Sequence, residues 1–102
     1  MRLNRILLST VFVFIAAMAK AKAKAEAPSA PKASATCTAC HGAKGVSANT
    51  LWPNLNGQKV DYVAKQLLDF KEGRRQDPLM SPVAKTLSAE DIKALSLYYS
   101  LL

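Results

Sequence analysis

Residues 35–45 read ATCTACHGAKG and bring Cys37, Cys40 and His41 together within five positions. The chain contains no other cysteine and no other histidine. Such a cluster is typical of a structural metal ion, of a redox disulfide, or of a larger prosthetic group held through its thiols. These sites belong to different classes of protein, so the rest of the chain has to discriminate between them.

The first 19 residues have the layout of a secretory signal peptide. Arg2 and Arg5 precede an apolar run at 6–19, and small-x-small sites follow. The apolar core of a signal peptide is roughly 7–15 residues long, whereas a bilayer span needs about 20 apolar residues. We therefore expect residues 1–19 to direct export and to be removed; the alternative is an uncleaved anchor.

Residues 20–35 are built mainly from Ala, Lys, Pro and Ser and contain no large apolar side chain. They cannot bury enough surface to offset the entropy of ordering, so we expect a flexible tether before a single domain at 36–102. The net charge of +7 lies mostly ahead of that domain, since from Cys37 onward eight Lys or Arg face six Asp or Glu. Without a basic stripe interleaved with aromatic side chains, this domain does not favour nucleic-acid binding.

Three segments of the domain have helical periodicity, and no stretch alternates as a strand, so the sequence predicts a small all-α fold. The expected helices are 33–41, ended by Gly42; 61–72, N-capped by Asp61 and ended by Gly73; and 89–102, N-capped by Ser88 with Asp91 completing a capping box. Two long loops separate them, which is unusual in so small a domain unless the loops surround something.

The apolar residues of the second and third helices recur at helical spacing and are expected to form the core. They are Val60, Val63, Ala64, Leu67 and Phe70 in the second helix, and Ile92, Leu95, Tyr98, Tyr99 and Leu102 in the third. Trp52 and Tyr62 are expected to join them.

A structural zinc site needs four ligands, whereas the cluster supplies three, and adjacent Cys40 and His41 point in different directions on a helix. A Cys-x-x-Cys oxidoreductase is expected near a βαβ pattern, which this chain lacks. The remaining interpretation is covalent attachment of a c-type haem, the direct meaning of C-x-x-C-H. The two thiols would lie on neighbouring turns and bond the haem edge, and His41 would lie beneath the iron.

Met80 is the only methionine of the domain, 39 residues after His41 in a Pro-rich loop. Thioether sulfur is a known axial ligand of haem iron, and it raises the reduction potential. A loop methionine can instead fill a gap in the packing, which is the alternative for this residue.

Three stretches in this order and spacing resemble the class I c-type cytochromes of bacteria. They are CTACHGAKG (37–45), WPNLNGQKVDYVAKQLLDFKEGRR (52–75) and PLMSPVAKTLSAEDIKALSLYYSLL (78–102). The chain is most similar to the short single-haem members and to the individual domains of dihaem cytochrome c4. It carries one C-x-x-C-H, so the resemblance implies one covalent haem c within a small class I cytochrome fold.

The resemblance also implies roles for individual residues. Cys37 and Cys40 would form the thioethers, and His41 and Met80 would be the axial iron ligands. The carbonyl of Pro53 would accept a hydrogen bond from the proximal imidazole, unless Pro53 is an ordinary turn proline. Gly42 would allow the backbone to pass close to the macrocycle.

A chain of this kind is expected to be a periplasmic electron carrier that cycles between Fe(II) and Fe(III), not an enzyme. Its partners would be a transient protein electron donor and acceptor, with no small-molecule substrate. One alternative is a gas sensor or peroxidase-like protein with an open iron. Another is a carrier domain tied by an uncleaved N-terminus to a larger membrane or dehydrogenase complex.

Overall fold

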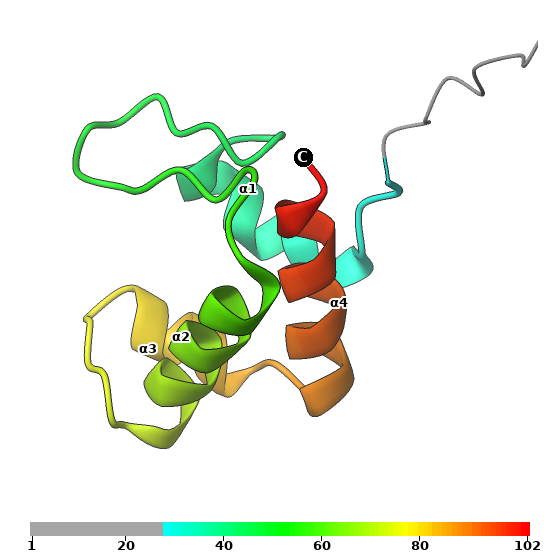
Figure 1. The fold of residues 1–102 in the computed structure, drawn as a ribbon. Helices are drawn as coiled ribbons and strands as arrows, with labels where there is room; N and C mark the ends of the chain where they lie inside the picture. The colour runs from blue at the N-terminus through cyan, green and yellow to red at the C-terminus, as the bar shows by residue number, and fades with distance from the viewer. Residues whose placement is uncertain (1–27) are drawn as a thin grey trace, which may run out of the picture.

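The structure, a computed structural model, describes residues 28–102. Its elements, in chain order, are a 3₁₀ helix η1 (Lys32–Ser34) and four α-helices: α1 (Ala35–His41), α2 (Val60–Glu72), α3 (Met80–Lys85) and α4 (Ala89–Ser100). Over these residues no strand is present, and the predicted all-α class is confirmed (Figure 1). The predicted signal peptide and residues 20–27 of the tether lie outside the described residues.

The N-terminal helical segment begins with η1, ahead of α1. Ser34 in η1 is buried, and its N–H donates a hydrogen bond to the carbonyl of Pro31 at 2.9 Å. At the other end, α1 stops at Gly42, as predicted from the sequence. Gly42 has a φ of 86°, a conformation that glycine adopts without the steric cost of a Cβ.

Helix α2 buries Val63 and Phe70 and ends at Gly73, which has the left-handed conformation typical of a residue that follows a helix. The predicted N-cap is wrong: α2 begins at Val60 after Lys59, and Asp61 lies in its first turn. A carboxylate in that turn still interacts favourably with the helix dipole. Asp61 is therefore favourable both as an N-cap and as a residue of the first turn, so its position does not distinguish the two helix starts.

Helix α3 occupies part of what the sequence predicted as a loop. It is six residues long, too short for its apolar residues to show a helical period. Pro82 stands within its first turn, where the missing N–H of proline removes no intrahelical bond.

Helix α4 starts as predicted. Ser88 Oγ accepts a hydrogen bond from the Asp91 N–H at 3.0 Å, and Asp91 Oδ2 accepts one from the Ser88 N–H at 2.9 Å. This reciprocal pair is a capping box, and it satisfies two backbone donors at the helix start.

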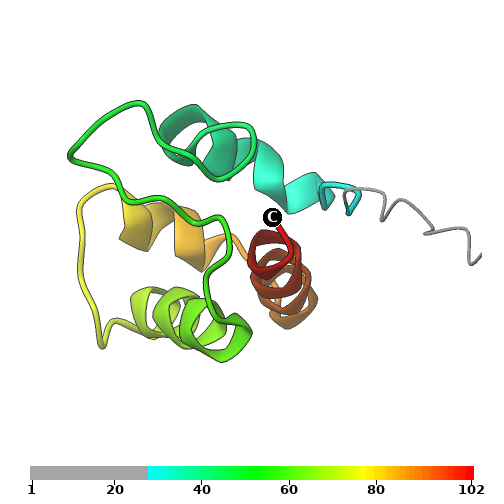
Figure 2. The same cartoon turned by 45° about the horizontal axis from the view of Figure 1, so that its top comes forward.

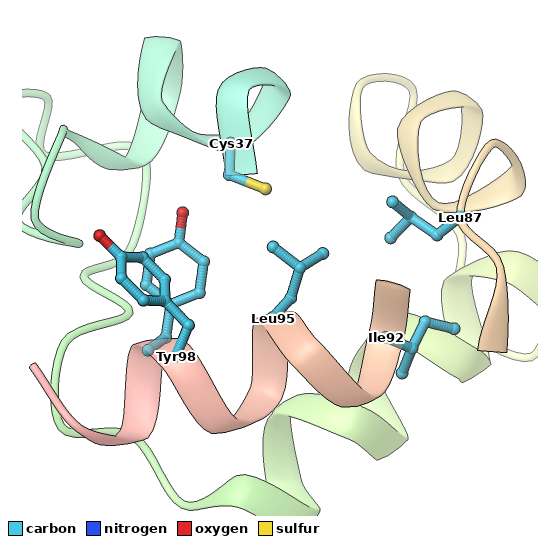
Figure 3. Packing of buried hydrophobic residues seen from close by; sticks show 6 residues of the cluster. Cys37, Leu87, Ile92, Leu95 and Tyr98 are labelled. Atoms are coloured by element: carbon cyan, nitrogen blue, oxygen red, sulfur yellow. The ribbon is translucent and has the colours of Figure 1, made fainter. Parts of the chain in front are cut away.

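The core gathers around α4, whose side chains reach α1 and the segment after α3 (Figure 3). Its buried cluster consists of Cys37, Leu87, Ile92, Leu95, Tyr98 and Tyr99. The predicted faces are largely confirmed; Leu102 and Leu67 are half-buried, and Val60 is exposed. Tyr62 is exposed, so its predicted place in the core is wrong, whereas Trp52 is half-buried like Leu67 and Leu102.

Helix α4 packs against η1 and against α2, and α3 packs on α2. Helix α1 and the α2–α3 pair consequently lie on opposite sides of the domain, with α4 joining them, as the two views agree (Figures 1 and 2). Loop 42–59 connects these two sides, whereas loop 73–79 joins α2 to α3 on one side. Within residues 28–102 no helix is long and apolar enough to cross a membrane.

Candidate functional site

Helix α1 positions both cysteines. Residues three apart in a helix are neighbours on its surface, so Cys37 and Cys40 share one side of α1. Cys37 is buried and Cys40 half-buried, and both are free thiols. In Figure 3 the Cys37 side chain extends from α1 into the space facing Leu95 of α4.

The surroundings of Cys37 are apolar. Burial raises the pKa of its thiol, which keeps the group protonated at neutral pH. Beside it lies the hydroxyl of Tyr99, whose side chain is 1% exposed and whose pKa burial also raises. Within the described residues that hydroxyl has no hydrogen-bond partner. Both polar groups are thus held in a core that is otherwise hydrophobic.

His41 ends α1 and is 7% exposed. Its Nδ1 lies 2.7 Å from the carbonyl oxygen of Pro53. A carbonyl oxygen only accepts hydrogen bonds, so Nδ1 carries the proton and donates it. In a neutral imidazole the other nitrogen, Nε2, then keeps its lone pair for a metal.

Loop 42–59 is fixed at several points, and this holds the Pro53 carbonyl in place. The Gly45 carbonyl accepts hydrogen bonds from the N–H groups of Leu55 at 2.8 Å and Asn56 at 3.1 Å. Asn54 Oδ1 accepts one from the Ser47 N–H at 2.7 Å. The loop is also bonded to α4, since the Gly57 N–H donates to the Tyr99 carbonyl at 2.8 Å.

Two glycines permit this folding of the loop. A Cβ at Gly42 would lie 1.9 Å from the Val46 carbonyl oxygen, so the close approach here is that of the loop to itself. This contact explains why a glycine is needed at position 42, and the resemblance did not imply it. A Cβ at Gly45, which sequence reasoning missed, would lie 2.8 Å from the Asn56 nitrogen. Both distances are shorter than a side chain tolerates.

Met80 comes from a different element. It is the first residue of α3 and is half-buried, on the side of the domain opposite α1. The structure therefore brings Cys37, Cys40, His41 and Pro53 together at one end of α1 and the loop after it. It places Met80 across from them, on the segment that packs on α2.

The donor atoms fit a c-type haem. Two free thiols, an imidazole nitrogen with its other nitrogen bonded, and one thioether are the atoms that covalent attachment and His/Met ligation require. Exposed apolar side chains adjoin both halves of the set, since Val46 and Leu51 lie in loop 42–59 and Leu79 precedes Met80. An apolar macrocycle is the kind of group that such side chains can cover. The individual roles toward haem remain predictions.

Sequence reasoning also missed Asp77. Its Oδ1 accepts hydrogen bonds from the N–H groups of Leu79 and Met80, both at 2.8 Å. The available signal was the order Asp-Pro-Leu-Met, because Asp at the first and Pro at the second position of a turn is a favoured combination.

Comparisons with known proteins agree with this geometry. Residues 25–98 match the family described as cytochrome c oxidase, cbb3-type, subunit III. The chain is 44% identical to cytochrome c4 of Thiocapsa roseopersicina over 69 residues, which covers 68% of this chain and 35% of that protein. It is 40% identical to cytochrome c-554(548) of Halomonas halodenitrificans over 68 residues, covering 64% of this chain and 82% of that protein.

The crystal structure of reduced recombinant cytochrome c4 from Pseudomonas stutzeri superposes with a TM-score of 0.61 and 49% sequence identity. The match covers 65% of this chain and 37% of that one. The chain thus spans about a third of the length of the cytochrome c4 relatives.

Proposed function

The chain belongs to the family described as cytochrome c oxidase, cbb3-type, subunit III, and is a class I c-type cytochrome with a single haem domain. From this family membership we propose that it carries electrons one at a time. When bound, haem iron supplies the Fe(II)/Fe(III) couple. The chain's own residues would hold the group, set the iron ligands and exclude competing ligands.

Cys37 and Cys40 would form the two thioethers. Their burial and their position on one side of α1 support this role, because both thiols can reach the same edge of a flat group. Addition of a thiol to a haem vinyl group forms the C–S bond and transfers the thiol hydrogen to carbon, so it needs no oxidant. Attachment would then fix the haem next to His41.

His41 would be the proximal ligand, and the observation that carries the proposal is its hydrogen bond to the Pro53 carbonyl. This bond selects the tautomer in which Nε2 is free, and it fixes the orientation of the ring. It also raises the basicity of the imidazole, which strengthens its bond to iron. A histidine that only filled the core would gain nothing from a free, unprotonated Nε2.

Met80 would be the second axial ligand. A thioether raises the reduction potential of haem iron, and it occupies the position where oxygen or peroxide would bind. This closure distinguishes a carrier from a gas sensor or a peroxidase-like protein, in which the iron has an open position. That the domain's single methionine starts α3, opposite α1, supports the assignment.

The proposed site of action is the periplasm, with residues 1–19 as the export signal, a tether that starts at residue 20 and ends where η1 begins, and the haem domain from η1 to residue 102. An electron donor and an electron acceptor would dock in turn. Encounters of this kind bury small interfaces, below about 1,200 Å², which allows rapid release.

The test is an optical spectrum of the oxidised holoprotein beside its Met80→Ala variant. We expect the wild type to show the weak near-infrared band of a ferric haem–methionine bond, and the variant to lack it. Both proteins should retain covalent haem by mass. Absence of the band from the wild type would reject His41/Met80 ligation and favour an open iron.

A further inference from the structure

We propose that Asp77 is a positioning residue that holds Met80 in place for the iron. This inference rests on the proposed function, because it takes Met80 as the second axial ligand. It concerns a residue that would touch neither the haem nor the iron and that acts through the backbone of its neighbour.

Four hydrogen bonds connect Asp77 to the three residues centred on Met80. Its Oδ1 accepts from the Leu79 and Met80 N–H groups, both at 2.8 Å. Its carbonyl accepts from the Ser81 N–H at 3.0 Å, and its own N–H donates to Ser81 Oγ at 3.0 Å. Every polar group of Asp77 that bonds in the structure therefore bonds to residues 79–81.

The chemistry of these bonds favours a rigid turn. The first N–H groups of a helix have no intrahelical partner, and an ionised carboxylate is a stronger acceptor for them than a neutral oxygen. Both N–H groups, those of Leu79 and Met80, converge on the same carboxylate oxygen, Asp77 Oδ1. Pro78 between them has a fixed φ, which reduces the freedom of the turn further.

Met80 depends on such a turn because its side chain is flexible. Methionine has three rotatable bonds beyond its Cα, so the position of its sulfur is defined only if its backbone is. Within residues 28–102 no other side chain accepts a hydrogen bond from the Leu79 or Met80 N–H, and Leu79 itself supplies no cap. The rest of α3 has an independent anchor, Ala84, which is fully buried. Loss of the Asp77 carboxylate should therefore loosen the turn at Met80 without unfolding α3.

The experiment measures how tightly imidazole binds the ferric holoprotein in competition with Met80. Apparent affinity for such a ligand is proportional to the fraction of molecules in which Met80 has left the iron. Removal of a helix-start acceptor costs enough for us to expect about ten-fold tighter imidazole binding by Asp77→Ala. Asp77→Asn keeps an oxygen acceptor but not the charge, so its imidazole affinity should lie between those of Asp77→Ala and the wild type.

Asp91→Ala is the matched control. Asp91 accepts a backbone N–H at the start of α4 by the same chemistry, but α4 carries no proposed iron ligand. We expect this variant to lower the unfolding midpoint and to leave imidazole affinity unchanged. The near-infrared band should weaken in Asp77→Ala only.

Three results would overturn the inference. One is an imidazole affinity of Asp77→Ala within about two-fold of that of the wild type, because a loosened Met80 should leave the iron more often and raise the affinity by more than this. Another is an equal increase in Asp91→Ala, which would show a general loss of stability. If the wild type itself lacks the band and binds imidazole like Met80→Ala, the proposed function fails as well, so the two failures are distinguishable.

Discussion

The two halves of the proposed haem site hold their ligands in different ways. On the proximal side, loop 42–59 bonds the His41 side chain itself, through the Pro53 carbonyl at 2.7 Å. On the distal side, Asp77 bonds the backbone of Met80, and within residues 28–102 no hydrogen bond reaches its thioether. A ligand held by its ring has a defined direction, whereas one held by its backbone keeps freedom in its side chain.

The halves also differ in charge. Loop 42–59 contains no Asp or Glu, while the distal segment from Asp69 to Asp77 contains three carboxylates. Two of them, Asp69 and Asp77, have a pKa below the ordinary value. The distal half should therefore be the first to yield, both to a competing ligand and to acid.

The largest effect is expected from His41→Ala. Without the imidazole, the proximal half has no ligand for iron, so the low-spin visible spectrum should disappear. Met80→Ala should keep that half and lose only the near-infrared band. Absorption spectra and haem content per chain would measure the difference; equal damage in the two variants would remove the asymmetry.

Leu95→Ala should affect both halves together. Leu95 is fully buried in α4, which connects them, and truncation of such a leucine costs about 2–5 kcal/mol of unfolding free energy. Guanidinium unfolding of the holoprotein would measure it. Leu97→Ala, at a position 52% exposed on the same helix, should stay within about 0.5 kcal/mol of the wild type. Similar losses in both variants would contradict the placement of the core.

Asn54→Ala removes a hydrogen bond from the proximal loop alone. The bond from the Ser47 N–H should contribute about 1 kcal/mol to the unfolding free energy. The near-infrared band should be unchanged, because Met80 is unaffected. Asn56→Ala is the control, since within residues 28–102 the Asn56 side chain makes no hydrogen bond. A weakened band in Asn54→Ala would show that the two halves are coupled.

The smallest effect concerns Asp69 and pH. The side chains of Lys65 and Arg74 bond its carboxylate and hold the pKa of Asp69 below the ordinary 3.8. A lowered folded-state pKa adds stability that is present above the unfolded pKa and is lost as the pH falls through the folded pKa. The unfolding midpoint of the wild type should therefore be higher than that of Asp69→Asn at neutral pH. This difference should shrink as the pH falls below about 4. A difference that stays constant down to low pH would contradict this assignment.

Much of the fold was predictable because its signals are local. The capping box of Ser88 and Asp91 marked the start of α4, and Gly42 and Gly73 marked helix ends. Helix α3 was not predictable in this way, since six residues are too few to show a period and its start depends on the Asp77 side chain. The start of α2 was ambiguous because Asp61 suits the cap and the first turn alike.

In the candidate site too, residues that are close in sequence were predictable, and contacts between distant residues were not. Cys37, Cys40 and His41 are close in sequence, so their pattern was legible without a structure. The partner of His41 lies 12 residues further on, and Gly45 and Asn54 act through contacts that only the folded loop creates. Tyr62 was predicted to be core from its residue type, but it lies on the outer side of α2, and Trp52 in loop 42–59 is only half-buried.

The most direct test of the central claim is the addition of carbon monoxide to the reduced holoprotein at neutral pH. If Met80 occupies the iron opposite His41, the spectrum of the wild type should remain unchanged while that of Met80→Ala shifts at once. If the wild type binds carbon monoxide as fast as Met80→Ala, the iron is open and the chain is not the closed electron carrier proposed for it.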